Sequence, residues 1–126
     1  MERRTVGGEG ADVVQAEMDE LLAQLSRQDP DFHPTARVVA YRPAYALDAS
    51  HTLPRALGAA IAGAGYPGEP TGMTFWTDAA ILADAGIPSV LFGPGGAGLH
   101  SISEYVNVDD VYACRDILVD AIKALV

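Results

Sequence analysis

The chain has 126 residues, about one small domain, and it carries a formal net charge of −9 at pH 7. An acidic chain without Lys/Arg clusters is poorly suited to nucleic acid or to anionic lipid, since both are bound by neutralising phosphate charge. The single cysteine excludes an intrachain disulfide framework. No run of about 18 apolar residues is present, and the N-terminus lacks the apolar core of a signal peptide. We therefore expect a cytoplasmic globular protein with no membrane or nucleic-acid partner.

The first half of the chain alternates extended and helical patterns. Residues 1–6 predict a short strand. Apolar side chains spaced by four, three and four residues predict an amphipathic helix over 11–27, and Asp29-Pro30 ends it because the residue before proline avoids helical backbone angles. Residues 35–47 again predict a strand, so the predicted order of elements in this half is strand, helix, strand.

The second half predicts helices separated by a strand and a glycine-rich loop. The expected elements are a helix over 52–64, a short helix between Asp78 and Gly86, a strand over 87–92, a glycine loop over 93–98 and a last helix after 107–109. Ser50 is placed to cap the first of these helices, and the all-apolar run 79–83 predicts that the short helix is buried. The succession of helix, strand, loop and helix is typical of the α/β class.

The glycine loop contains the pattern G-x-G-x-x-G, formed by Gly93, Gly95 and Gly98. This pattern is typical of dinucleotide-binding turns when a helix follows it directly. Here the chain after Gly98 is β-rich, so the sequence disfavours a nucleotide site. A glycine loop also lets the backbone approach a ligand closely and directs the residue that follows it.

The residue directed by this loop is His100, just beyond the expected strand and loop. Neutral histidine is the commonest metal ligand in proteins, and Glu104 is close enough in sequence to support its second ring nitrogen. From these residues alone, a histidine with a purely structural or solvent-facing role is the favoured interpretation, because one His and one Glu at short spacing are common by chance.

Four short segments between Thr71 and Val111 resemble one family in their order and spacing. They are Trp76–Ala79, Ala85–Val90, Phe92–Gly95 and His100–Val106. The family is that of the co-catalytic zinc amidohydrolases and peptidases, which includes acetylornithine deacetylase, succinyl-diaminopimelate desuccinylase, aminoacylase and glutamate carboxypeptidase. The stretch Glu2–Glu9 is similar to a strand of the smaller lid domain of these enzymes, so the resemblance covers nearly the whole chain.

The resemblance implies an α/β fold made of two partial domains. Residues 1–46 resemble half of an α+β lid or dimerisation domain, and residues 47–126 resemble the C-terminal part of the catalytic domain. In the family, the general base and the other metal ligands are carried by a His-x-Asp pair, a bridging Asp, a Glu-Glu pair and another acidic residue in upstream parts. Neither the His-x-Asp nor the Glu-Glu motif occurs in this sequence. We therefore expect a C-terminal portion of such an enzyme, with no catalytic residue of its own and no activity in isolation.

The resemblance also implies roles for individual residues. His100 matches a zinc ligand, with Glu104 supporting it, and Arg4 matches an arginine that pairs with the carboxylate of the substrate. Other positions match the lining of the substrate pocket; these are Thr77, Gly95 and Gly96. The bulky Phe75 and Trp76 depart from some members of the family, so the acyl group and amino acid do not follow from the resemblance.

The implied reaction is hydrolysis of the amide bond of an N-acyl amino acid or small peptide. Two zinc ions, about 3.5–4 Å apart and replaceable by cobalt, would activate a water molecule and polarise the carbonyl. The implied partners are a small carboxylate-bearing substrate and a second copy of the chain. The alternative is a non-catalytic dimerisation module, in which exposed Tyr41 and Tyr45 beside a sheet edge serve the interface.

The remaining polar residues have ordinary structural interpretations. Asp78 is more typical of a helix N-cap than of a metal ligand, because its carboxylate can accept bonds from unpaired amides. Cys114 lies on the apolar face of the last expected helix and is predicted to be inert core. His33 and His51 are predicted to lie at the surface.

Overall fold

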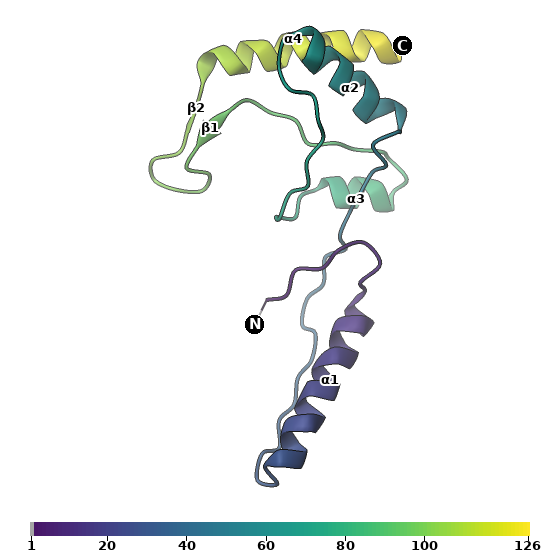
Figure 1. Cartoon of the computed structure of the whole chain (residues 1–126), viewed down its shortest axis with the longest axis vertical. Helices are drawn as coiled ribbons and strands as arrows, with labels where there is room; N and C mark the ends of the chain where they lie inside the picture. Colours follow the sequence, from purple (N-terminus) through teal and green to yellow (C-terminus); the bar gives the residue numbers. More distant parts are fainter. Residues whose placement is uncertain (1) are drawn as a thin grey trace.

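The computed structural model describes residues 2–126 and is helix-rich. Its elements are α1 (Ala11–Gln28), α2 (Thr52–Gly63), α3 (Ala79–Asp84), β1 (Gly96–Ala97), β2 (Tyr105–Val106) and α4 (Val108–Leu125) (Figure 1). The two strands pair antiparallel, with Gly96 opposite Val106. The predicted helices are confirmed, and helices combined with a small sheet fit the predicted α/β class broadly. None of the described helices has both the length and the apolar character needed to cross a bilayer.

The strands predicted over 1–6, 35–47 and 87–92 are not found in the part of the chain that the structure describes, which leaves out Met1. These segments are extended, but a strand also requires a neighbour that pairs with its backbone groups. Residues 35–47 instead run back along α1 (Figure 1). There the Val38 N–H donates to Oε1 of Gln15 at 2.9 Å, and the Gln15 amide donates to the Ala36 carbonyl at 3.0 Å.

The packed core lies between α2 and α4, at the opposite end of the molecule from α1 (Figure 1). Leu57 of α2 and Ile117 and Ala121 of α4 are 8%, 4% and 5% exposed. Val90 and Phe92 pack against these three side chains from the extended segment that precedes β1. Burial of apolar area therefore fixes the path of the chain that leads into the glycine loop.

The cap of α2 differs from the prediction. His51, rather than Ser50, is the N-cap, and its Nδ1 accepts a hydrogen bond from the Leu53 N–H at 3.2 Å. The Ser50 N–H instead donates to Oδ1 of Asp48 at 2.7 Å, within the turn that precedes the helix. His51 is half-buried as a result, which corrects its predicted surface position.

Two glycines follow the ends of α2 and α3, and the second of them, Gly86, is the stop that the sequence predicts. Gly65 and Gly86 have φ angles of 84° and 75°. In each case the next residue donates back to the helix: Tyr66 N–H to the Ile61 carbonyl at 3.1 Å, and Ile87 N–H to the Leu82 carbonyl at 2.9 Å. This is the Schellman arrangement, in which a left-handed residue satisfies carbonyls at the end of a helix.

The predicted burial of α3 is largely wrong. Ala80 is buried, whereas Ile81 and Leu82 are 56% and 43% exposed. Within residues 2–126, no other helix or strand packs extensively on α3, so most of its apolar side chains stay exposed. Asp78 is the N-cap residue but makes no side-chain capping bond, and Cys114 of α4 is half-buried rather than fully in the core.

Candidate functional site

An open groove of about 1380 Å³ lies between the N-terminal residues and the C-terminal part of the chain. Its walls come from four extended segments, at 2–7, 42–47, 66–77 and 89–95, and from residues of α2, α3 and α4. Typical small-ligand sites measure about 300–1000 Å³, so the groove has room for a small substrate and more.

Arg4 lines this groove. Its Nε donates to the Glu2 carboxylate at 3.1 Å, and its Nη1 donates to the carbonyl of Thr74. The side chain is 62% exposed, so its interaction with Glu2 is weakened by solvent. Arg4 thus lies in the groove with donors accessible to solvent, as a residue that binds an anionic group would.

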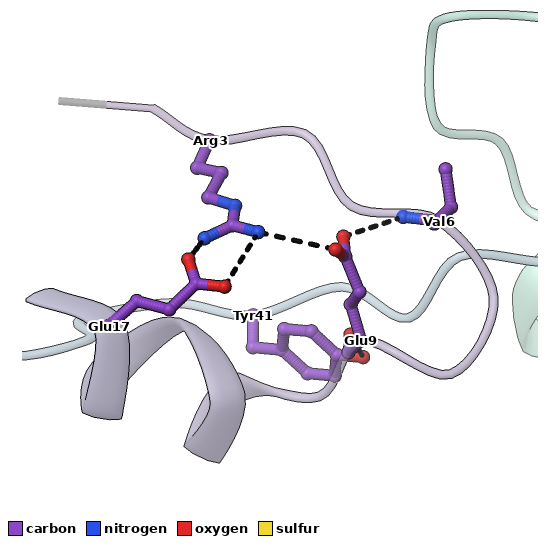
Figure 2. A network of polar contacts seen from close by, with 5 residues as sticks. All are labelled: Arg3, Val6, Glu9, Glu17 and Tyr41. Atoms are coloured by element: carbon purple, nitrogen blue, oxygen red, sulfur yellow. Dashed lines mark hydrogen bonds and ion pairs between the residues drawn. The ribbon is translucent and has the colours of Figure 1, made fainter.

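A polar network holds the N-terminal residues against α1 (Figure 2). Arg3 forms ion pairs with Glu17 and with Glu9, the latter at 3.2 Å, and the other Glu9 oxygen accepts the Val6 N–H at 3.1 Å. The Tyr41 hydroxyl donates to the Glu9 carbonyl at 3.1 Å, which attaches the segment that returns from α1 to the N-terminal residues. We call Arg3, Glu9 and Glu17 the N-terminal clamp; it fixes the backbone directly before Arg4.

Two further contacts join the first 47 residues to the rest of the chain. The Arg42 guanidinium lies 5.5 Å from the centroid of the Trp76 ring. The Tyr45 hydroxyl donates to the Ser89 carbonyl at 2.9 Å and accepts the Ser89 N–H at 3.0 Å. Arg42 carries no signal in the sequence, because an isolated arginine in an extended segment has no periodic pattern or motif around it.

The pocket-lining residues inferred from the resemblance separate in the structure. Thr77 and Gly95 line the groove, whereas Gly96 lies in β1, outside the groove wall. Gly95 packs against the Asp110 carboxylate so closely that a Cβ would approach Oδ2 to 2.6 Å, and its carbonyl accepts the Asn107 N–H at 2.9 Å. At Gly96 a Cβ would lie 2.1 Å from the Tyr105 carbonyl oxygen. Close packing against the backbone therefore requires glycine at position 96, whereas at position 95 the end of the Asp110 side chain could move aside.

His100 lies in the loop that joins β1 to β2, with an exposed side chain and a φ angle of 64°. Glu104 accepts a hydrogen bond from the His100 backbone N–H at 3.2 Å, so its carboxylate fixes the main chain of the histidine rather than its ring. A positive φ is uncommon for a residue other than glycine and is found disproportionately at functional sites. The loop therefore presents the imidazole to solvent from a constrained backbone.

The donor set of the described residues does not complete a metal site. Within residues 2–126, no three or more His, Cys, Asp and Glu side chains gather where they could hold an ion. A catalytic zinc ion takes three protein ligands, and His100 provides one candidate. His100 is also not part of the groove wall that contains Arg4.

A family model described as peptidase family M20/M25/M40 matches residues 5–124. The chain belongs to this family. The match extends from the N-terminal residues before α1 to the last turn of α4, so it includes the His100 loop and most of the groove wall, whereas Arg4 lies just before the matched residues. Members of the M20 family are generally metal-dependent.

Among curated proteins, the chain is similar to an acetylornithine deacetylase of Myxococcus xanthus. The two are 28% identical over 123 residues, which cover 97% of this chain and 31% of that relative. This M20 chain thus spans about a third of the length of the curated relative that it matches. No solved structure matches it significantly.

The contacts of two tyrosines alter one argument for the non-catalytic alternative. Tyr45 is half-buried and makes two hydrogen bonds to Ser89, so its predicted exposure is wrong. Tyr41 is 39% exposed, but its hydroxyl is used by the Glu9 carbonyl. Both side chains hold the chain together internally, which weakens the case for them as interface residues.

Proposed function

We propose that this M20 chain is the C-terminal portion of a zinc-dependent amidohydrolase that hydrolyses the amide bond of an N-acyl amino acid or small peptide. The observation that carries this proposal is His100, because a constrained backbone presents its imidazole in a chain that belongs to a metal-dependent family. The deacetylase relative supports the reaction class, since its name describes removal of an acyl group from an amino acid.

In this proposal each residue has a limited role. His100 supplies one metal ligand, Glu104 fixes the main chain of His100, and Arg4 binds the carboxylate of the substrate. When bound, zinc would supply Lewis acidity toward the amide carbonyl. The remaining ligands and the general base would come from outside these 126 residues, in the range of the relative that this chain does not cover. Two zinc ions per site, exchangeable for cobalt, remain part of the proposal.

The test is made in a longer polypeptide that contains this chain together with the remaining ligands. We expect His100→Ala to lower zinc content and to reduce kcat/KM at least 10–100-fold, the range seen when even supporting residues of metal sites are removed. Arg4→Ala should keep its zinc and lose about tenfold in kcat/KM, since a hydrogen bond to a charged group is worth about 1.5–3 kcal/mol. His33→Ala is the matched control and should change neither quantity.

Two outcomes would contradict the proposal. A His100→Ala protein with full zinc content and near-normal rate would show that His100 is not a ligand. Chelator-sensitive hydrolysis of N-acetyl amino acids by the 126-residue chain alone would show that the site is complete without further ligands.

Self-association is a separate part of the proposal. Large apolar side chains are exposed both before and after α2, among them Val39 at 81% and Ile102 at 110%. Water-exposed apolar surface favours association, so we expect homodimers or larger species of the isolated chain. Analytical ultracentrifugation over a range of concentrations tests this, and a single monomeric species at every concentration would contradict it.

A further inference from the structure

Two guanidinium groups meet the same short segment of the groove wall, residues 74–76. Arg4, from the N-terminal residues, donates to the Thr74 carbonyl. Arg42, from the segment that returns from α1, lies over the Trp76 ring. Arginines 38 residues apart in sequence are thus brought together in a chain whose net charge is −9. Two like charges on one wall favour an anion between or beside them.

The two arginines differ in how their charge is balanced. Arg4 forms an ion pair with Glu2 at 3.1 Å. Among the residues that the structure describes, Arg42 forms no ion pair with a carboxylate, and its Nη1 donates to the adjacent Tyr41 carbonyl at 3.1 Å. Arg42 therefore keeps an uncompensated positive charge on the wall of the groove.

The contact with Trp76 leaves Arg42 able to bind a ligand. A cation–π contact of this kind occupies none of the five guanidinium N–H donors in a hydrogen bond to an oxygen, and the Tyr41 carbonyl uses one of them, on Nη1. The contact also limits the rotamers of the side chain, so less conformational entropy is lost when an anion binds. The in-plane donors match the two oxygens of a carboxylate.

We propose that Arg42, supported by Trp76, binds a second carboxylate of the substrate, beside the one bound by Arg4. The ligand class is an N-acyl amino acid with two carboxylates, such as an N-acyl dicarboxylic amino acid. This inference rests on the proposed function, because it takes Arg4 as the site of the first carboxylate. It adds a specificity-determining residue that neither the motifs nor the resemblance marked.

The test compares two probes of nearly equal size, N-acetyl-glutamate and N-acetyl-glutamine, which differ by one carboxylate. Binding to the full 126-residue chain is followed by calorimetry and by the fluorescence of Trp76, the single tryptophan, which lies beneath Arg42. We expect N-acetyl-glutamate to bind about tenfold or more tightly, as a charged hydrogen-bonded pair predicts. Arg42→Gln should reduce that preference to near unity and leave the affinity for N-acetyl-glutamine unchanged.

Three variants control for charge and geometry. Arg37→Gln removes the same charge from an exposed position of the same segment, outside the groove wall, and should keep the preference. Arg42→Lys keeps the positive charge but lacks the planar guanidinium, and it should keep only part of the preference for N-acetyl-glutamate. Arg4→Gln should weaken both probes alike, because both carry the first carboxylate.

The outcomes separate this inference from the proposed function. Equal or undetectable binding of the two probes to the unchanged chain, an undiminished preference in Arg42→Gln, or equally tight binding of inorganic phosphate would overturn it. A dicarboxylate preference that depends on Arg42 supports it, even if the longer polypeptide shows no metal-dependent hydrolysis. That last result would overturn the proposed function alone.

Discussion

The two longest helices of the molecule have equal length and unequal burial. α1 and α4 each have 18 residues, but α1 contains no buried residue, whereas α4 buries Ile117 and Ala121 against α2. The region up to residue 47 is held together by polar contacts: the N-terminal clamp, the Gln15 amide and the Tyr41 hydroxyl. The region from residue 48 onward is held by apolar packing.

This difference shows that an amphipathic stripe does not by itself create a core. Both helices have apolar side chains at helical spacing, but the partner of α1 is one extended segment, while the partner of α4 is another helix. Leu21 and Leu25 of the α1 stripe consequently remain 48% and 39% exposed. The stabilisation of a helix in a protein comes mostly from what packs on its apolar face.

The largest expected effect comes from shortening a core side chain of the helix pair. Ile117→Ala should lower the free energy of unfolding by about 2–4 kcal/mol, because it removes buried methyl groups and leaves a cavity between α2 and α4. Met18→Ala in α1 should cost less than about 1 kcal/mol, since that side chain is half-buried and alanine favours helix. Urea unfolding followed by circular dichroism measures both.

The control for this comparison is Ile122→Ala, on the same helix at a position that is 58% exposed. It should change stability by no more than about 0.5 kcal/mol. Equal losses for Ile117→Ala and Met18→Ala would mean that the two regions do not differ in the way that burial indicates.

Local signals in the sequence were enough to predict the helices and their ends. The apolar spacing located α1, α2 and α4, and Gly86 marked the end of α3. Strands could not be predicted with the same success, because an extended segment becomes a strand only when another segment pairs with it. The local sequence pattern does not indicate which segment that will be. The cap at His51 was missed for a related reason, since histidine is a rare cap and the more common Ser50 stands beside it.

The candidate site shows the same limit. The glycine loop and His100 were found because glycine and histidine have distinctive chemistry, and Arg4 because its motif resembles a family. The backbone contact of Glu104 and the position of Arg42 on Trp76 depend on how the loop and the wall fold in three dimensions. The contact between Arg42 and Trp76 joins residues 34 positions apart and leaves no periodic trace in the sequence.

The second prediction tests whether the hairpin depends on the helix pair. Gly96→Ala places a Cβ against the Tyr105 carbonyl, and a backbone atom cannot move aside as a flexible side chain can. We expect loss of the pairing between β1 and β2, at about 1–3 kcal/mol, with the α2–α4 core retained. The measurement is amide hydrogen exchange at Asn107, whose N–H donates to the Gly95 carbonyl at 2.9 Å beside the strand pair, and at core positions of α4.

Gly93→Ala is the matched control, because a Cβ at Gly93 meets no atom within 4 Å. It should leave the exchange at Asn107 unchanged. Faster exchange throughout α4 in Gly96→Ala would contradict the separation of hairpin and core.

The third prediction concerns the N-terminal clamp. Glu9→Gln removes the charge that Arg3 pairs with but keeps an oxygen for the Val6 N–H. Because both side chains are about one-third exposed, the expected loss is about 0.2–1 kcal/mol, confined to the residues before α1. Hydrogen exchange at Val6 should accelerate less than tenfold and should become less sensitive to salt. The control Glu20→Gln, on the exposed surface of α1, should change neither the exchange rate at Val6 nor its salt dependence. A loss of stability in Glu9→Gln as large as that in Ile117→Ala would contradict weak, polar stabilisation of this region.

The smallest effect is expected at the boundary between the two regions, where Asp48 precedes α2. The hydrogen bond from the Ser50 N–H, followed by that from the Ser50 hydroxyl, lowers the pKa of Asp48 below its ordinary value of 3.8. A carboxylate whose folded pKa is depressed contributes stability at pH values above its unfolded pKa. This contribution is lost as the pH falls below 3.8 through the folded pKa.

NMR titration of the Asp48 carboxyl carbon should therefore give a midpoint below 3.8. In Ser50→Ala, which keeps the N–H and removes the hydroxyl, the midpoint should rise only part of the way, because the main-chain bond is the larger cause. A midpoint at or above the ordinary value in the unchanged chain would mean that this turn does not hold the start of α2 in solution, and the boundary between the polar and apolar regions would then lie further along the chain.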